Sequence, residues 1–335
     1  MIPPMSIDLE RRELLKTAAA LATAAVGTMA VSRAEAQDRG AAAPGASNDA
    51  DTLHFFPAGF KHDKVQTSGA TINVVRGGDG PPLLLIHGAP QSHVSWHKVA
   101  PDFAKDHTVV MPDLRGYGDS SKSPDTPDHA NYSKRAMALD MVEVMKHYGF
   151  TRFPVVGHDR GGRVGQRLAL DHADKVTHLT VLDIVPTYYL YTHVTIEFVQ
   201  AYYHWFHQLR PAPVPEKEIF AQNETAKARA TDPIQVEWLR TASTMENIHA
   251  MCEDYRAAAS IDLQHDKADL EKKITCPLST LWGERGPMGR LYDVLAIWKE
   301  RGTKVSGKGL PGGHNLMIDV PDQTIAEVRA LLKTT

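Results

Sequence analysis

Cysteine is scarce in this sequence, which holds only Cys252 and Cys276 in 335 residues. A disulfide framework is thereby excluded, because such scaffolds need several cysteine pairs. The sequence also lacks a CxxC pair and any Cys/His spacing typical of structural zinc. His93 and His97 in HVSWH have i,i+4 spacing but no glutamate between them, so we predict that they lie at the surface or rim and bind no metal.

A strong charge bias and long apolar runs are lacking too. The formal net charge is −3, and no segment is dense in lysine and arginine, so nothing indicates a nucleic-acid partner. Beyond residue 50, no apolar run is long enough to span a bilayer. With 42% hydrophobic residues, the chain is long enough for one large core, with or without an inserted domain.

The N-terminus has the three parts of an export signal. The charged segment ERRELLK is followed by an Ala-rich apolar stretch and then by the small-x-small site Ala34-Glu35-Ala36. The adjacent Arg11 and Arg12 resemble the twin-arginine type of signal.

We therefore predict a signal peptide at residues 1–36, a flexible linker at 37–50 and a periplasmic location. We expect no membrane association once the signal is removed. An amphipathic N-terminal helix is the alternative, but no polar face recurs through residues 17–31.

From residue 51 onward, strand-like and helix-like segments alternate, which predicts an α/β fold with a mostly parallel sheet. PPLLLIHGAP is apolar throughout, as expected of a strand buried on both faces. SKRAMALDMVEVMKHYG has apolar residues at helical spacing, and Gly149 ends it. Further strands are expected in TINVVRGG, HTVVMP, FPVVGHD, HLTVLDIVPT, STLWGERG and TKVSGKGL.

The pattern changes at Tyr188. Residues 188–261 are rich in aromatics and helical in period, with a break at RPAPVPE and no strand-like run. We predict that 188–261 form a helical cap, inserted into a core made of 51–187 and 262–335.

The stretch GHDRGGR at 157–163 follows a predicted strand and opens a predicted helix. Strand, G-x-nucleophile-x-G and helix together are typical of the nucleophile elbow of an α/β-hydrolase, with Asp159 where many such enzymes have serine. Gly157 and Gly161 are small because strand and helix approach closely there. An ordinary N-cap aspartate is the alternative, since Asp is a preferred N-cap.

A carboxylate nucleophile needs no base to activate it, because it is already ionised near neutral pH. It can attack an sp3 carbon and form an ester, which a histidine-activated water then cleaves. His314, in PGGHNL after the last predicted strand, is the candidate base. Asp183, at the end of TVLD, is its predicted acidic partner in preference to Glu284. A strand-end carboxylate that caps a loop is the alternative for Asp183.

Backbone N–H groups of Ala89, in HGAP, and of Arg160 are predicted to form the oxyanion hole. Arg160 and Arg163 place two cations at the start of a helix, where positive charge is unfavourable. Surface positions are the alternative for both side chains, but this cost favours a functional role.

A resemblance to the haloacetate dehalogenases, α/β-hydrolases that include the fluoroacetate dehalogenases, covers nearly all of residues 53–335. It implies an α/β-hydrolase fold with a cap, no cofactor, no metal and a homodimer. The segments that carry it, in this order, are HGAPQSHVSWHKVAP, DLRGYGDSS, GHDRGGRVGQRLALDH, VLDIVPTY, HWFHQLRPAPVPE, CEDYRAAASIDLQHDK and LWG.

The resemblance implies that Asp159 is the nucleophile, His314 the base and Asp183 the acid. It implies that Arg160 and Arg163 bind the carboxylate of the substrate, as the planar fork of a guanidinium can.

The resemblance also implies that His204, Trp205 and Tyr255 hold the departing halide through N–H and O–H donors. Simple packing within the cap is the alternative for these three residues, because aromatics at helical spacing usually form a core.

The expected reaction is hydrolytic dehalogenation of a short anionic 2-haloacid, such as fluoroacetate or chloroacetate, through an aspartyl ester. Its products are the 2-hydroxy acid and halide. An epoxide hydrolase, with Tyr255 as proton donor, would use the same Asp/His/Asp residues. A non-catalytic ligand-binding protein is a third hypothesis, which the intact nucleophile, base and acid candidates disfavour.

Overall fold

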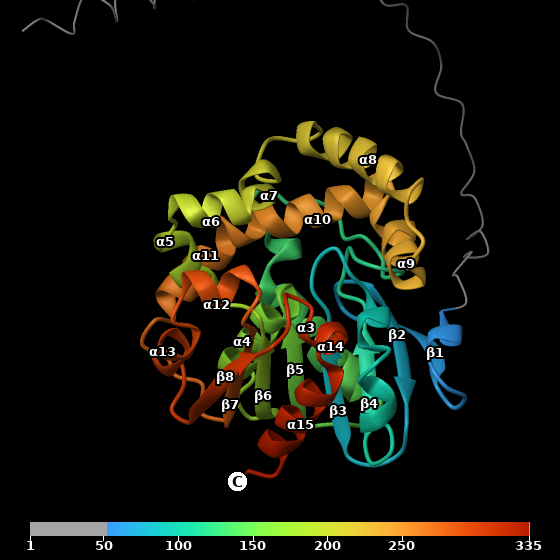
Figure 1. The fold of residues 1–335 in the computed structure, drawn as a ribbon, viewed down its shortest axis with the longest axis vertical. Coiled ribbons are helices and arrows are strands. Elements are labelled where there is room, and N and C mark those ends of the chain that lie inside the picture. Colours follow the sequence, from blue (N-terminus) through green and yellow to red (C-terminus); the bar gives the residue numbers. More distant parts are fainter. Residues whose placement is uncertain (1–51, 335) are drawn as a thin grey trace, which may run out of the picture. The chain divides into compact units, whose positions relative to one another are not determined.

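The computed structural model describes residues 52–334, so the predicted signal peptide and linker lie outside the described residues. An eight-stranded sheet forms the centre, in the order β1-β2-β4-β3-β5-β6-β7-β8 (Figure 1). Its strands are β1 (Lys61–Gln66), β2 (Thr71–Gly77), β3 (Pro82–Ile86), β4 (Thr108–Pro112), β5 (Phe153–His158), β6 (Val176–Leu182), β7 (Leu278–Gly283) and β8 (Val305–Leu310).

The sheet is mostly parallel, as predicted. Strand β2 pairs antiparallel with β1 and β4, and every other neighbouring pair is parallel. The α/β fold class predicted from the alternating pattern of the sequence is therefore confirmed. Strand β1 was not predicted, because its sequence KHDKVQ is largely polar and buries only Val65. A strand at the edge of a sheet can remain polar where a central one cannot.

Both faces of the sheet are buried. Along β3, Leu84 and Ile86 belong to one hydrophobic cluster, whereas Leu83 and Leu85 belong to another. This alternation explains why PPLLLI has no polar position. The helices outside the region between β6 and β7 are α2 (Ala100–Phe103), α3 (Lys134–His147), α4 (Arg160–Asp171), α12 (Pro287–Leu291), α13 (Val294–Lys299), α14 (Leu316–Asp319) and α15 (Pro321–Leu332).

Between β6 and β7 the described chain forms helices and loops, with one isolated β-bridge from Ile274 to Gly302. Figure 1 shows α6 to α10 arching over one end of the sheet, which agrees with the helical character predicted for 188–261. The boundaries assigned to cap and core stay a prediction. These helices are α5 (Thr187–Thr192), α6 (Ile196–Ala201), α7 (Tyr203–His207), α8 (Val214–Lys227), α9 (Pro233–Ala242), α10 (Met245–Ala258) and α11 (Ile261–Ala268).

The structure corrects the position predicted for His93, which is 1% exposed. Its Nδ1 lies 2.9 Å from Oδ1 of Asp113, and its Nε2 lies 2.8 Å from the hydroxyl of Thr52. His93 is thus a buried structural group with both ring nitrogens satisfied, whereas His97 is partly exposed. Within residues 52–334, none of the helices combines the length and apolar character that crossing a membrane requires.

Strand β5 and helix α4 meet at Asp159, which has a φ of 47°. This left-handed conformation is costly for a residue with a side chain. The turn also brings backbone segments very close together, since a Cβ at Gly161 would lie 2.2 Å from the carbonyl oxygen of Ile86. A Cβ at Gly157 would lie 2.4 Å from the carbonyl oxygen of Gly161. Both positions therefore need glycine because neighbouring backbone leaves no room for a Cβ, and not because of a positive φ.

We expect Gly161→Ala to lower the free energy of unfolding by about 3 kcal/mol, because the added methyl overlaps backbone that the sheet holds in place. Gly149→Ala is the control, since a Cβ there meets no atom within 4 Å. Its φ of 83° should still cost about 1–2 kcal/mol of strain. Urea denaturation of the three proteins measures both losses, and a smaller loss at position 161 than at 149 would contradict the crowding.

Candidate active site

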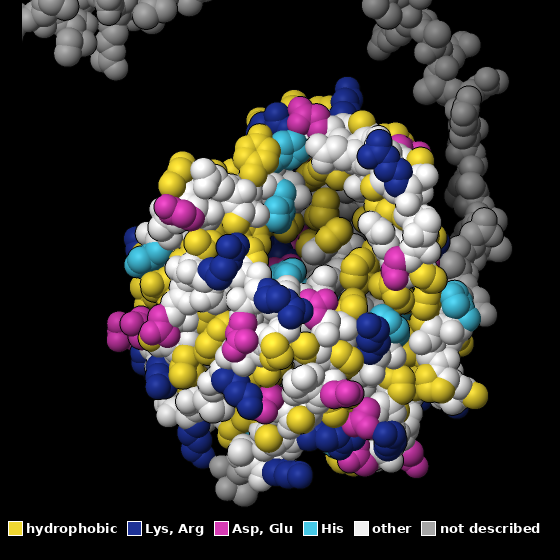
Figure 2. Space-filling model, viewed as in Figure 1, with side chains coloured by type: hydrophobic (Ala, Val, Ile, Leu, Met, Phe, Trp, Pro, Cys, Tyr) yellow, Lys and Arg dark blue, Asp and Glu magenta, His cyan; other side chains and the backbone are white. Residues whose placement is uncertain are grey.

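A cavity of about 420 Å³ lies between the core and the helices above it. Figure 2 shows the molecule hollowed beneath the arch of these helices, with histidine side chains at the edge of the hollow. Six of the predicted site residues line this one cavity: Ala89, Asp159, His204, Trp205, Tyr255 and His314. The rest of the lining includes Pro90, Tyr202, Gln208, Ile219 and Met251.

Asp159 presents its carboxylate to this cavity from the turn between β5 and α4. Its Oδ2 accepts a hydrogen bond from the backbone N–H of Ala89 at 3.1 Å. Burial acts to raise the pKa of Asp159. Electrostatic interactions with His314, His158, Arg160 and Arg163 outweigh this effect, so the pKa lies below its ordinary value. Asp159 is therefore ionised at neutral pH, as a carboxylate nucleophile must be.

His314 is oriented by Asp183 and not by Glu284, which is exposed. Its Nδ1 lies 2.6 Å from Oδ2 of Asp183, and the other oxygen of Asp183 accepts the N–H of Gly283 at 2.8 Å. With Nδ1–H donating to Asp183, Nε2 is the nitrogen that can accept a proton. Burial acts to lower the pKa of His314, but the hydrogen bond to Asp183 and the charge of Asp159 raise it above its ordinary value.

A second histidine, His158, supports the loop that carries His314. Its Nε2 lies 2.9 Å from the backbone oxygen of His314, and its Nδ1 lies 3.1 Å from Gln91. Gln91 also donates to the side chain of Asn315 at 2.7 Å. Burial lowers the pKa of His158 to about 3, so its imidazole is neutral. His158 is thus a structural support rather than a second base.

His204, Trp205 and Tyr255 form one wall of the cavity. The ring of Tyr255 lies 6.0 Å from that of His204 and 5.7 Å from that of Trp205, centroid to centroid. Burial lowers the pKa of His204 to about 4 and raises the pKa of Tyr255 above its ordinary value. At neutral pH this wall therefore carries an uncharged imidazole, an indole N–H and a phenol O–H.

Arg160 and Arg163 lie next to this wall on the first turn of α4, but they do not line the cavity. Their exposed fractions are 0% and 1%. The guanidinium carbon of Arg160 is 3.9 Å from the ring centroid of Tyr255, and that of Arg163 is 4.5 Å from the ring centroid of Trp205. The aromatic wall thus stands between the two guanidinium groups and the open part of the cavity.

The two arginines have few polar partners. Arg160 binds Asp254, and Nη1 of Arg163 donates to the hydroxyl of Thr187 at 2.8 Å. Among residues 52–334, Nη1 of Arg160 and both Nε and Nη2 of Arg163 have no hydrogen-bond partner. Unpaired buried donors are costly unless a ligand satisfies them.

Comparison with known proteins places this geometry in a family. The model of the alpha/beta hydrolase fold matches residues 81–227. A fluoroacetate dehalogenase from a Burkholderia species is 44% identical over 290 residues, which cover 82% of this chain and 94% of the relative. This chain belongs to the fluoroacetate dehalogenase family of α/β-hydrolases. The prediction that it is a hydrolase is thereby confirmed.

Solved structures extend the comparison. A protein from Nostoc sp PCC 7120 described as an alpha/beta hydrolase is 49% identical, with a TM-score of 0.79, and the match covers 82% of this chain and 99% of that one. A protein from Pseudomonas aeruginosa described as an epoxide hydrolase is 39% identical, with a TM-score of 0.75 and coverage of 83% and 96%.

Sequence analysis missed Asp254, Thr187 and His158 as parts of the site. Asp254 and His158 directly precede the predicted residues Tyr255 and Asp159. This adjacency is the one feature of the sequence that indicates a place near the site for them. Their roles depend on contacts between segments distant in sequence, which spacing alone does not reveal.

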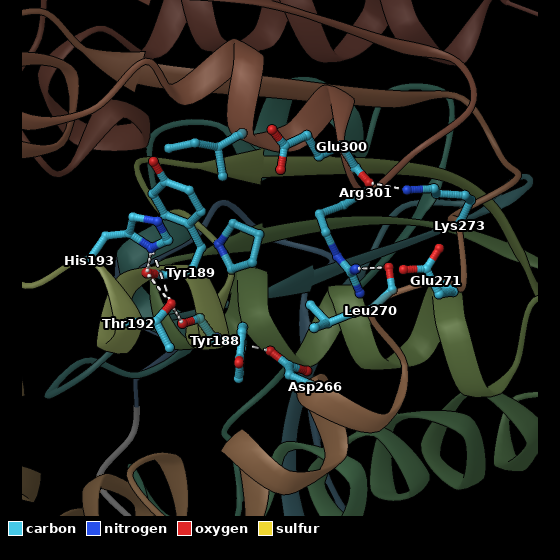
Figure 3. Close-up of a pocket in the computed structure, with 12 residues that line it drawn as sticks. Tyr188, Tyr189, Thr192, His193, Asp266, Leu270, Glu271, Lys273, Glu300 and Arg301 are labelled. Atoms are coloured by element: carbon cyan, nitrogen blue, oxygen red, sulfur yellow. Dashed lines mark hydrogen bonds between the residues drawn. The ribbon is translucent and has the colours of Figure 1, made fainter.

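A larger cavity, of about 670 Å³, lies against α5, α11 and α13 (Figure 3). Its cations already have acceptors, since Arg301 donates to the backbone of Leu270 and Lys273 to that of Glu300, each at 2.6 Å. Among its lining residues, Oγ1 of Thr192 lies 3.1 Å from Nδ1 of His193, but this hydroxyl already donates to the backbone oxygen of Tyr188 at 2.7 Å. The predicted nucleophile Asp159 and the predicted base His314 both line the smaller of these two cavities.

One group of side chains away from this cavity has the spacing of metal ligands. Ligand atoms of Asp125, His249 and Glu253 all lie within 4.8 Å of one another. The ring of His249 already lies between two carboxylates, with Nε2 2.9 Å from Asp125 and Nδ1 3.1 Å from Glu216. Arg256 donates to Glu253 and Glu216 at 2.8 Å. Ion pairs that join α8 and α10 to the loop at Asp125 account for this group.

The stabilisation from His249 should depend on pH. Burial acts to lower its pKa, but hydrogen bonds to Asp125 and Glu216 raise the pKa above its ordinary value of 6.5. A folded-state pKa above the unfolded one gives stability that is complete below the unfolded value and is lost as the pH rises through the folded value. We therefore expect His249→Asn to lower the melting temperature more at about pH 5.5 than at about pH 8.5. Equal losses at the two pH values would contradict an imidazolium in this network.

Proposed function

We propose that this protein hydrolyses the carbon–halogen bond of short 2-haloacids, such as fluoroacetate and chloroacetate, through an ester on Asp159. The observation that carries the proposal is an ionised, buried aspartate beside two buried arginines with unused N–H donors. Such a site suits a substrate that is both an electrophile at carbon and a carboxylate. The name of the Burkholderia relative supports the same reaction.

In the first step, one oxygen of Asp159 attacks the carbon that bears the halogen. The N–H of Ala89 holds Oδ2, which leaves Oδ1 to form the new bond. The carbon–halogen bond breaks and the halide departs with its electron pair. Donors on His204, Trp205 and Tyr255 replace water around the small anion. The product of this step is an ester whose carbonyl oxygen stays at the N–H of Ala89.

In the second step, water attacks the carbonyl carbon of this ester while His314 takes the proton. The N–H of Ala89 stabilises the resulting oxyanion. The tetrahedral intermediate then expels the 2-hydroxy acid and regenerates Asp159, so that water and haloacid give hydroxy acid, halide and a proton. Esterification also removes the charge of Asp159, one of the causes that raise the pKa of His314. The neutral base is therefore favoured at the step that needs it.

Arg160 and Arg163 are proposed to bind the carboxylate of the substrate. Their unused donors suit its two oxygens, and Arg163 has no carboxylate within ion-pair distance in the described chain. Because the rings of Trp205 and Tyr255 lie against both guanidinium groups, we propose that these rings shift when the substrate enters.

An epoxide hydrolase remains the second candidate. The raised pKa of Tyr255 keeps its O–H protonated in the same cavity as Asp159, where it could donate to an epoxide oxygen. The name of the Pseudomonas aeruginosa protein agrees with that activity. The two buried arginines favour the haloacid, because an epoxide carries no charge for them to bind. Measuring halide release and diol formation side by side separates the two activities.

We also propose that the protein acts in the periplasm, which rests on the twin-arginine-like segment at 10–36 of the sequence alone. Homodimerisation likewise stays a proposal drawn from the family resemblance.

We expect His314→Asn to be alkylated by fluoroacetate but to release little hydroxy acid, because the ester forms without the histidine and is cleaved only with it. Intact-mass spectrometry should show one adduct, and peptide mapping should place it on Asp159. Asp159→Asn is the control and should lose more than about 1,000-fold in turnover, with no adduct. Halide release that survives in Asp159→Asn would refute the aspartyl-ester mechanism.

Replacing Trp205 by Phe should affect fluoride more than bromide. The substitution keeps an aromatic ring beside Arg163 but removes the indole N–H. Fluoride is the poorer leaving group and the more strongly hydrated anion, so it depends more on donors. We expect kcat to fall about tenfold or more with fluoroacetate and only a few-fold with bromoacetate, as measured with halide-selective electrodes. An equal loss with both substrates would argue that Trp205 only packs the cap.

A further inference from the structure

Arg160 is the more tightly constrained of the two buried arginines. Its Nε donates to Oδ2 of Asp254 at 2.8 Å, and its Nη2 donates to the backbone oxygen of Asp254, also at 2.8 Å. The ring of Tyr255 covers one face of the guanidinium group at 3.9 Å. Two consecutive residues of α10 thus fix one edge and one face of the guanidinium group of Arg160. Its Nη1 is left without a partner in the described chain.

Asp254 is itself fixed from the core side. Lys134 donates to its Oδ1, and the hydroxyl of Tyr117 donates to its Oδ2 at 2.6 Å. The side chains of Asp254 and Arg160 are both 0% exposed. A buried carboxylate with this many donors has one orientation, so it determines where Arg160 lies.

Arg163 has a different electrostatic environment. Its recorded polar contact is the hydroxyl of Thr187, and no carboxylate lies within ion-pair distance among residues 52–334. Burial and the neighbouring Arg160 lower its pKa, whereas Asp254 raises that of Arg160 against the effect of burial. Arg160 therefore has a direct ion pair with Asp254, whereas Arg163 is opposed only by the charges of Asp159 and Asp266, neither of which lies within ion-pair distance.

We propose that Asp254 is a positioning residue of the carboxylate-binding site. It holds Arg160 by one edge so that Nη1 on the other edge serves the substrate carboxylate, while Arg163 supplies the net charge that attracts the anion. This inference rests on the proposed function, since it concerns the carboxylate of the haloacid. The competing role is charge damping, in which Asp254 only reduces an excess of positive charge.

The two roles predict opposite effects when Asp254 is removed. Loss of a damping charge would strengthen anion binding, whereas loss of a positioning group would weaken it. The test is made in a Lys134→Met background. Removing Asp254 alone would leave both Lys134 and Arg160 buried without their shared carboxylate. In that background Asp254→Ala removes the acceptor for Nε of Arg160, and Asp254→Asn keeps a neutral acceptor. Both substitutions remove the same charge.

We expect the dissociation constant of glycolate, measured by calorimetry, to rise about tenfold from Lys134→Met to Lys134→Met/Asp254→Ala. KM for fluoroacetate should rise by a similar factor, and kcat should change less than KM. Lys134→Met/Asp254→Asn should restore most of the loss, to within about threefold of the background.

The control is Asp262→Asn in the wild-type chain. Oδ2 of Asp262 lies 3.6 Å from Nζ of Lys134, but Asp262 has no recorded hydrogen bond or ion pair with Arg160. It should leave glycolate binding unchanged. If the alanine variant does not fold, Asp254→Glu in the wild-type chain replaces it, since it keeps the charge and displaces the carboxylate by one methylene. Positioning predicts weaker glycolate binding in Asp254→Glu, and damping predicts no change.

Tighter or unchanged glycolate binding after Asp254→Ala, or equal values for the alanine and asparagine variants, would overturn the positioning role. So would an equal weakening in Asp262→Asn. The proposed function fails separately: a wild-type protein that releases no halide from any haloacid refutes dehalogenation. The glycolate affinities would then still decide whether Asp254 positions a carboxylate-binding arginine.

Discussion

The turn at Asp159 is the constraint on which the rest of the site depends. Strand β5, helix α4 and the end of β3 meet there so closely that a single added methyl at Gly161 would overlap the backbone of Ile86. In this turn Asp159 has a positive φ, and its carboxylate accepts the N–H of Ala89. The same turn decides where α4 begins, and with it the positions of the arginines on its first turn. One local geometry therefore places the proposed nucleophile, the proposed oxyanion donor and the two arginines.

Charge around this carboxylate is distributed unevenly, and the distribution suits a two-step reaction. In the free protein Asp159 is the counterion for the neighbouring cations, and they lower its pKa. In the proposed reaction Asp159 loses its charge on becoming an ester, and Arg163 has no other carboxylate within ion-pair distance in the described chain. The carboxylate of the proposed substrate would then take over as counterion. A neutral substrate would leave that charge unbalanced at the intermediate, which is a physical reason for the site to prefer acids.

The fold was largely predictable from the sequence because its central strands are buried on both faces and read as apolar runs. Strand β1 escaped prediction because an edge strand can remain polar. Asp159 and His314 could be proposed from the sequence because each follows a predicted strand within a glycine-rich turn or loop, and Asp183 because it ends a predicted strand. The burial of Arg160 was not predictable, since it depends on Asp254, which is 94 residues further along the chain. His93 was assigned to the surface because its partners Asp113 and Thr52 are likewise distant in sequence.

Helix α10 carries two sets of contacts on one short stretch. Asp254 and Tyr255 face the start of α4, while His249 and Glu253 belong to the ion pairs that reach the loop at Asp125. Each residue advances a helix by about 100°, so an insertion or deletion between Glu253 and Asp254 would turn one set of side chains relative to the other, and both sets could not keep their partners. The spacing between these two sets of contacts therefore constrains the length of this part of α10.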